Sequence, residues 1–356
     1  MKQVLGVNMK VFSDLHHYDL YYSLQLLFEK RLDWELYRPI GPEWHEQGYW
    51  HVYEHPATVK QFLGLYQGMK EPLLDGEGVP WTERELVNKN YIIEDGIYYI
   101  QDNCHRTTHR AVTLDKFKEM EFDILLSSIP QHIQPYNKLI TEFQPKAKHI
   151  FQVGNQWGNL PGAKNIMAST TPFQSAANTI FYHQEFDLNV FKYEAPTNHN
   201  TICSYVHYLQ QPEKLQQLVS LLPGWSGIPY GGGMPQSLPN QDAVAEALKN
   251  SAFTWHFKPG GDGFGHSIFS SYACGRPALI WRPHYTGRKA DPLFIDQQTC
   301  IDSNSYSSHK LAQLLQKFSQ PEEHIKMCEA AYRRFCQIVN FDQEFEQIKL
   351  FLERLQ

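Results

Sequence analysis

The stretch GGDGFGHSIFSSYACGRPALI, residues 260–280, gives the clearest indication of the fold. It follows the apolar segment FTWHF (253–257), which reads as a buried strand, and its first glycines allow positive φ angles and close approach of the backbone to a ligand. The apolar run that begins at Ile268 predicts a helix. Gly275 and Pro277 would end that helix, because glycine is favoured just past a helix C-terminus and proline cannot continue it.

The loop of this strand, loop and helix unit has the composition of an anion-binding site. Free amides are expected at Gly265, His266 and Ser267, and they would point back into the loop, where a helix N-terminus attracts phosphate. Lys258 stands at the start of the loop and adds a positive charge. The alternative is an ordinary glycine-rich turn without a ligand, since single glycine-rich loops are weak signals.

Residues 244–280 resemble the donor-binding segment of GT-B glycosyltransferases, in which a helix and a strand lead to Glu-Gly-Phe-Gly, a second helix and Ala-x-Gly-x-Pro-x-Ile. The corresponding segments here are DGFG (262–265) and ACGRP (273–277). The resemblance implies that Asp262 and the amides after it meet the sugar and diphosphate of a nucleotide-sugar, and that Lys258 neutralises phosphate charge. The residues implied to bind the donor are Lys258, Gly261, Asp262, Gly263, Phe264, Gly265, His266, Ser267 and Ser270.

Two positions depart from the family pattern. Many retaining members carry a second glutamate, which holds the ribose hydroxyls, where this chain has Ser270. A serine makes fewer hydrogen bonds than a carboxylate and cannot hold two hydroxyls in the same way. The family's basic pair after the first strand of the second domain is also missing, since that segment offers only Lys214, out of register. The guanidinium groups that can assist Lys258 with the phosphates are those of Arg276, Arg282 and Arg288.

Two further segments are candidates for contacts to the base or the sugar. Gly231 starts a glycine run after the strand SGIPY, and Tyr230 before it offers a ring on which a nucleobase can stack. Asn155 and Trp157 follow a buried strand, so that Trp157 can stack on a sugar and Asn155 can hydrogen-bond to it. Ordinary turns explain both segments equally well.

The N-terminal half offers a candidate base in the loop SDLHHYD, residues 13–19. His16 or His17 is suited to accept the proton of an attacking hydroxyl, because an imidazole titrates near neutral pH. Asp14 would orient the ring of His16, although a helix N-cap is the simpler role for this aspartate. We take His16 and Asp14 as the catalytic candidates.

The segment CHRTTHR, residues 104–110, places His105 and His109 four apart beside Cys104. It lacks a third metal ligand at a usual spacing and lies in an expected loop, so no metal site is predicted. A solvated basic loop explains the segment most simply, and a basic patch facing an anionic substrate is the alternative. Glu185, near the domain junction, is a carboxylate that either reaches the site or lies on the surface.

The rest of the chain repeats an α/β rhythm in two halves. Strands and helices alternate through the first half, a polar segment follows at 187–201, and the alternation resumes with a strand at 202–209 and a helix at 212–222. Such alternation is typical of parallel sheets with crossover helices. We therefore predict an α/β chain of two Rossmann-like domains that face a central cleft, as in GT-B proteins. The predicted parts are an acceptor domain, 1–186, a nucleotide-sugar-binding domain, 187–335, and a C-terminal helix, 336–356, that packs back on the first domain.

The composition is that of an ordinary globular protein. Of the 356 residues, 42% are hydrophobic and 20% are charged, which leaves little room for disorder. A net charge of -6 gives no overall field that would gather nucleic acid. The six cysteines form no Cys-x-x-Cys pair, so we expect reduced thiols. The sequence also lacks a signal peptide and an apolar run of about 20 residues, which makes the cytoplasm the expected location.

The predicted function is metal-independent glycosyl transfer from a nucleotide-diphosphate sugar to an unidentified acceptor, which is a glycan, a lipid, a protein or a modified nucleic acid. No cofactor is expected besides the nucleotide-sugar substrate, because helix-end amides and cationic side chains can stabilise the departing diphosphate. Two alternatives stay open. One is a nucleotide-sugar epimerase of the same architecture, and the other is a sugar- or nucleotide-binding protein without turnover, which Ser270 would favour.

Overall fold

The computed structural model describes residues 8–15, 17–41, 43–49, 86, 90–154, 160, 162–205, 211–231, 234, 236–259 and 261–355. The chain divides into two compact units. Unit 1 consists of Met1–Glu185 and Gln343–Gln356, and unit 2 consists of Phe186–Asp342. The junction predicted from the sequence, after residue 186, lies one residue from the first boundary between the units. The predicted start of the returning helix, residue 336, lies several residues before the second boundary.

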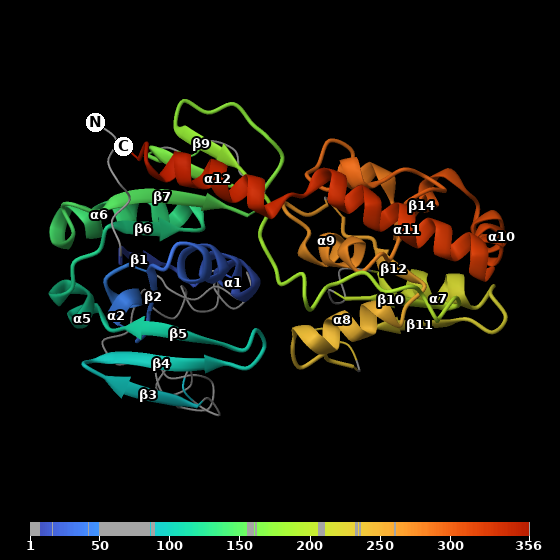
Figure 1. The fold of residues 1–356 in the computed structure, drawn as a ribbon, viewed down its shortest axis with the longest axis horizontal. Helices are drawn as coiled ribbons and strands as arrows, with labels where there is room; N and C mark the ends of the chain where they lie inside the picture. The colour runs from blue at the N-terminus through green and yellow to red at the C-terminus, as the bar shows by residue number, and fades with distance from the viewer. Residues whose placement is uncertain are drawn as a thin grey trace. The chain divides into compact units, whose positions relative to one another are not determined.

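The described residues of unit 1 form a nine-stranded sheet in the order β3-β4-β5-β2-β1-β6-β7-β8-β9 (Figure 1). The seven strands from β5 to β9 in this order pair in parallel, and β3, β4 and β5 form an antiparallel edge. The strands are β1 (Lys10–Ser13), β2 (Glu35–Pro39), β3 (Tyr91–Glu94), β4 (Ile97–Asp102), β5 (Thr107–Val112), β6 (Ile124–Ser127), β7 (Lys148–Val153), β8 (Asn165–Ala168) and β9 (Asn178–Phe181).

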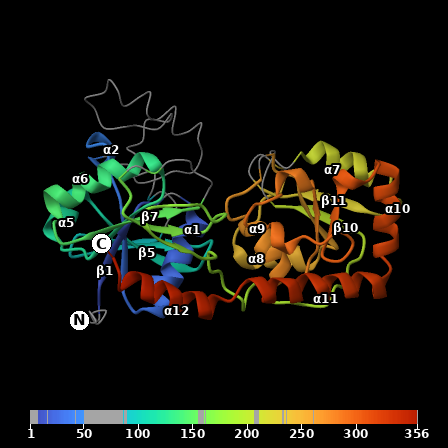
Figure 2. The ribbon, with the colours of Figure 1, turned by 90° about the horizontal axis from the view of Figure 1, so that it is seen from above.

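Helices cover both faces of this sheet because alternate residues of its strands point to opposite sides. Val11 packs against α1 (Tyr18–Gln25) and α12 (Phe341–Leu352) on one face, and Phe12 packs against α5 (Leu114–Glu119) and α6 (Ile133–Phe143) on the other (Figure 2). Ile348 and Phe351 of α12 lie in the same core as Val11, which confirms that the C-terminal helix packs on the first domain. Further helical segments among the described residues of unit 1 are η1 (Leu26–Arg31), α2 (Glu43–Glu46) and η2 (Pro130–His132).

Unit 2 is built on a five-stranded parallel sheet in the order β11-β10-β12-β13-β14. Leu279 packs toward α7 (Pro212–Val219) and α10 (Ser308–Phe318), whereas Ala278 and Ile280 pack toward α8 (Gln241–Lys249), α9 (His266–Ala273) and α11 (Pro321–Ile338). The strands are β10 (Thr201–Ser204), β11 (Ser226–Pro229), β12 (Phe253–His256), β13 (Ala278–Ile280) and β14 (Cys300–Asp302). Short helical turns among the described residues of unit 2 are η4 (Arg282–His284), η5 (Asp291–Leu293) and η6 (Ser303–Ser305).

Both sheets reverse their direction of growth at one point. In unit 1 the strands β1 and β6 are neighbours, with β2 on the far side of β1. In unit 2 the strands β10 and β12 are neighbours, with β11 on the far side of β10. Open α/β sheets bind ligands beyond the carboxyl ends of the strands at such a point, because the two loops diverge there to opposite faces. We therefore expect ligand-binding residues directly after these four strands, β1, β6, β10 and β12.

None of the helices in the described part of the chain is long and apolar enough to cross a membrane.

Candidate functional site

The loop after β12 carries the predicted donor motif and leads into α9. Gly265 precedes this helix with φ +79°, and as a glycine it supplies no side chain to cap the helix N-terminus. Gly261 has φ +69°, and a Cβ at this position would lie 2.3 Å from the carbonyl oxygen of His284. Glycine fits both positions because L side chains disfavour the left-handed region. The loop therefore packs against the segment after β13 and supplies a glycine, rather than a capping side chain, before α9.

Asp262 lies beside this helix end and already has two partners. Its carboxylate forms an ion pair with Nζ of Lys258, and its Oδ2 lies 3.2 Å from Nε2 of His256. Burial alone would raise the pKa of Asp262, but His256 and Lys258 outweigh this effect and hold the pKa well below its usual range. Asp262 is therefore a carboxylate at neutral pH. Asp262 and Lys258, both predicted to bind the donor, neutralise each other's charge in this structure.

Tyr285 fixes the start of the loop. Its hydroxyl lies 2.5 Å from Nδ1 of His256, donates to the His256 carbonyl oxygen at 3.1 Å and accepts the Lys258 N–H at 3.2 Å. All of the Tyr285 side chain is buried between the segments after β12 and β13. The backbone of Lys258 is thus held at the carboxyl end of β12, while its side chain is about one third exposed.

Two of the three arginines predicted to assist with phosphate are committed to the fold. Arg276 is fully buried and donates to three main-chain carbonyl oxygens. Arg282 forms an ion pair with Asp291 and donates to another carbonyl. A guanidinium whose donors are all used inside the protein cannot also clamp a phosphate, so Arg276 stabilises the domain instead.

Arg288 and Lys214 add positive charge near the loop. The Cγ atom of Arg288 lies 3.5 Å from the place where a Cβ on Gly261 would be, and its side chain forms no hydrogen bond or ion pair with any described residue. Lys214 of α7 lies with Nζ 5.8 Å from the ring centroid of Trp281, directly after β13. Burial lowers the pKa of His284, and the charge of Lys214 lowers it further. Lys214 therefore reaches this edge of the sheet, although its position in the sequence is out of register with the family's basic pair.

Two other predicted residues serve the core in this structure. The ring of Phe264 is buried and stacks on Phe269 at a centroid distance of 4.6 Å. Ser270 is buried, and its hydroxyl donates to the His266 carbonyl oxygen at 2.9 Å, within its own helix. A ring enclosed by core side chains has no free face for a sugar, and this hydroxyl is engaged by the backbone. The sequence did not distinguish these core contacts from ligand contacts, because both need the same spacing along the helix.

The remaining predicted residues of unit 2 lie on the loops at the same edge of the sheet. Gly263 is buried within the donor loop, and Ser267 is half-buried in the first turn of α9. Tyr230 follows β11 and stacks on Tyr205, which follows β10, at a centroid distance of 5.7 Å. Gly231 has φ +117°, so the chain turns directly after Tyr230. These positions are compatible with the predicted ligand contacts, which stay predictions.

Unit 1 has its own polar cluster at the carboxyl ends of β1 and β6. Asp14 is buried and accepts hydrogen bonds from the N–H and the hydroxyl of Ser128, both at 2.6 Å. Nδ1 of His132 lies 2.6 Å from the same carboxylate. Asp14 therefore orients an imidazole, as the sequence suggests, but the histidine is His132, and His17 rather than Asp14 caps α1. The predicted residues His16, Asn155 and Trp157 lie outside the described residues.

The 104–110 segment is a turn and a strand rather than a loop, because Thr107–Val112 forms β5. His105 is buried between two carboxylates, with Nδ1 2.6 Å from Asp102 and Nε2 3.0 Å from Asp19. Burial alone would lower the pKa of His105, but Asp102 and Asp19 raise it to about 9. The described residues contain no group of three or more side chains able to hold a metal ion. The histidine therefore joins the edge hairpin to α1 as a buried cation.

Glu185 has a structural partner within unit 1. Its two carboxylate oxygens accept hydrogen bonds from Nε and Nη2 of Arg31 at 2.7–3.1 Å. Such two-point pairs are the strongest ion pairs that an arginine makes. Glu185 thereby ties the end of unit 1 to η1.

No protein-family model matches the sequence, and no curated protein matches it either. Solved structures do match over nearly the whole chain. Sucrose-phosphate synthase from Thermosynechococcus elongatus has a TM-score of 0.61 at 11% identity, with 98% of this chain and 99% of that chain covered. HepE from Anabaena in complex with UDP has a TM-score of 0.60 at 11% identity, covering 98% and 100%. The pneumococcal O-GlcNAc transferase GtfA, in complex with UDP and GlcNAc, has a TM-score of 0.52 at 9% identity, covering 97% and 99%.

These neighbours are glycosyltransferases of GT-B architecture. The chain therefore has the GT-B fold, as its sequence predicted. At 9–11% identity the similarity concerns the fold alone.

Proposed function

We propose that this protein transfers a glycosyl group from a nucleoside diphosphate sugar to an acceptor hydroxyl. The observation that carries the proposal is the N-terminus of α9, which follows a glycine and lies at the carboxyl edge of the unit 2 sheet beside Lys258 and Arg288. Amides at a helix N-terminus and flexible cations are the groups that bind a diphosphate. The UDP bound to the structural neighbours HepE and GtfA supports the same ligand class.

The proposed reaction needs charge stabilisation at the leaving group. The bond between the anomeric carbon and the diphosphate oxygen breaks, and the diphosphate leaves with the electron pair. A new bond forms between the anomeric carbon and the acceptor oxygen, whose proton passes to a base. Lys258, Arg288 and the α9 amides would hold the departing diphosphate, which is why we propose transfer without a metal ion.

Binding of the diphosphate would redistribute the charges around Asp262. A phosphate group would compete with Asp262 for the amino group of Lys258, because both are anions that seek the same cation. Asp262 would keep its contact with His256 and could then accept hydrogen bonds from sugar hydroxyls. The ion pair between Lys258 and Asp262 thus belongs to the ligand-free site.

Isothermal titration calorimetry with UDP and with uridine tests the proposal. UDP should bind more tightly than uridine, and Arg288→Ala should weaken UDP by about tenfold or more, because hydrogen bonds to charged groups contribute about 1.5–3 kcal/mol. Arg333→Ala is the matched control, since Arg333 pairs with Glu329 on the exposed face of α11. If no nucleoside diphosphate binds the wild-type protein, the proposal fails.

Turnover then separates the transferase from its alternatives. Release of nucleoside diphosphate from a nucleotide-sugar that depends on an added acceptor supports transfer. Conversion of the nucleotide-sugar to its epimer without an acceptor supports an epimerase. Tight binding with neither reaction, across a broad panel of donors and acceptors, supports a binding protein without turnover.

A further inference from the structure

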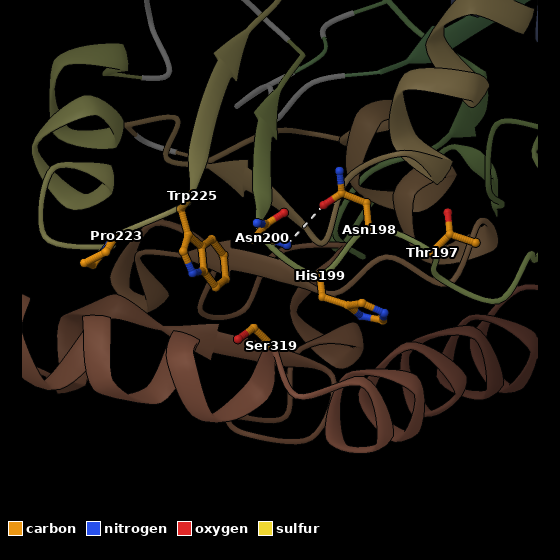
Figure 3. Close-up of a pocket in the computed structure, with 7 residues that line it drawn as sticks. All are labelled: Thr197, Asn198, His199, Asn200, Pro223, Trp225 and Ser319. Carbon is orange, nitrogen blue, oxygen red and sulfur yellow. Dashed lines mark hydrogen bonds between the residues drawn. The ribbon is translucent and has the colours of Figure 1, made fainter.

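A polar pocket of about 500 Å³ lies at the opposite end of the unit 2 sheet from the donor loop. It is lined by Thr197–Asn200 before β10, by Pro223 and Trp225 before β11, and by Ser319 after α10 (Figure 3). Its volume falls within the range of about 300–1,000 Å³ that is usual for small-molecule sites. The donor loop follows the carboxyl ends of the strands, whereas this pocket lies at their amino ends, so the two sites are separate.

Trp225 gives the pocket a rigid aromatic wall. Its ring stacks on Phe253 of the core at a centroid distance of 6.2 Å and an interplanar angle of 23°. The same ring lines the pocket (Figure 3). An aromatic ring that is held by the core and borders a polar pocket is suited to stack on the C–H face of a sugar ring, since it loses little conformational freedom on binding.

His199 is held in one tautomer by a buried neighbour. Nε2 of His324 lies 2.9 Å from the Ala252 carbonyl oxygen, so this nitrogen carries the proton. Burial lowers the pKa of His324 to about 4, which leaves Nδ1 as an acceptor at neutral pH. Nδ1 of His199 lies 2.8 Å from that acceptor and must therefore donate. The lone pair of a neutral His199 is then on Nε2, as an acceptor for a ligand.

Other lining groups also leave acceptors available. Nδ2 of Asn200 donates to the Gly224 carbonyl at 2.7 Å, which leaves its Oδ1 for a ligand. The Ser319 hydroxyl donates to the Gln316 carbonyl at 2.9 Å, so its oxygen can only accept a further hydrogen bond. The described lining contains no aspartate, glutamate, lysine or arginine. Acceptors without charge suit a neutral ligand with several hydroxyl donors, and they offer nothing to a phosphate.

We propose that this pocket binds a neutral pyranoside, such as one sugar unit of a glycan, through stacking on Trp225 and hydrogen bonds to His199 and Asn200. This site does not depend on the proposed nucleotide site. Its occupant would bind with or without nucleotide, because the two sites lie at opposite ends of the strands.

Saturation-transfer difference NMR on the full chain, with methyl β-D-glucopyranoside and methyl β-D-galactopyranoside as probes, tests the proposal. Transfer to the ring protons of at least one probe is expected, unchanged by saturating UDP. Trp225→Ala should weaken binding by about tenfold or more. Trp281→Ala is the matched control, because Trp281 packs against the same core but follows β13. It should leave pyranoside binding unchanged.

Ser319→Glu provides a second variant that avoids the core. It places a bulky charge at the pocket and should also abolish transfer, while circular dichroism confirms that the fold is kept. Absence of transfer in the wild type would overturn the proposal, as would unchanged binding in a folded Trp225→Ala or Ser319→Glu variant. Displacement of the pyranoside by UDP would also overturn it, because the sugar would then occupy the nucleotide site.

Discussion

Gly261→Ala is the substitution for which the donor loop makes the sharpest prediction. The residue has φ +69°, and a Cβ would lie 2.3 Å from the His284 carbonyl oxygen. The left-handed conformation costs a non-glycine residue about 1–2 kcal/mol. A contact under 3.0 Å with a backbone atom cannot be relieved by a side-chain rotation, so the loop must move away from the segment after β13. We expect a total loss of about 2–4 kcal/mol.

Gly287→Ala separates the conformational cost of Gly261→Ala from its steric cost. Gly287 has φ +70°, almost the same angle, but a Cβ there would meet no atom within 4 Å. Its substitution should therefore cost only the conformational part, about 1–2 kcal/mol. The difference between the two variants measures the steric part alone.

Hydrogen exchange of the β12 and β13 amides, followed by mass spectrometry, reports the stability of unit 2 without interference from unit 1. Gly287→Ala should reduce protection by about 5–30-fold, and Gly261→Ala should reduce it further. UDP titrations should show weaker binding for Gly261→Ala than for Gly287→Ala. Equal protection and equal UDP affinity in the two variants would refute the packing of the donor loop described here.

Three further predictions concern charged and titratable groups. Lys258→Ala should weaken UDP more than uridine and should raise the pKa of Asp262; an equal loss for both ligands would contradict a phosphate role. The raised pKa of His105 stabilises unit 1 fully below pH about 6.5, and this stability should be lost as the pH rises through about 9. Urea unfolding should show this fall in the free energy of unfolding, and His105→Gln should remove it. The lowered pKa of His324 gives the opposite pH dependence of stability, because the unfolded chain binds the proton at a higher pH than the folded chain. Unit 2 should lose stability as the pH falls from about 6.5 to 4, and His324→Gln should flatten that slope in hydrogen exchange.

The elements of the fold could be predicted from the sequence where the apolar periodicity and the residues that end a helix agree. The helix predicted from the apolar run at Ile268 lies within α9 (His266–Ala273). The predicted end at Gly275 also holds, since this residue has φ +73° directly after α9. The edge strand β5 was missed because Thr107–Val112 is rich in polar residues, and an edge strand needs no continuous apolar run.

For the predicted donor site, the sequence indicated the backbone conformation of the loop but not the partners of its side chains. Glycine spacing indicates where a loop approaches a ligand, and Gly261 and Gly265 have the positive φ angles that this requires. The same pattern does not show which side chains are free, because that depends on partners distant in the sequence. Arg276 and Arg288 looked equivalent in the sequence, but only the structure shows that one is buried among carbonyl groups and the other is not.

The cluster around Asp14 shows how strand order decides chemistry that local sequence cannot. Residue 14 follows β1 and residue 128 follows β6, more than one hundred residues later. Their contact exists because β1 and β6 are neighbours where the sheet reverses its growth, which brings the two carboxyl ends together. The local sequence suggested an adjacent histidine as the partner of Asp14, whereas the strand order places the His132 ring of η2, which follows β6, against this carboxylate. The same geometry places Lys258 after β12 and Tyr205 after β10 in unit 2, so strand order there too should decide which residues meet a ligand.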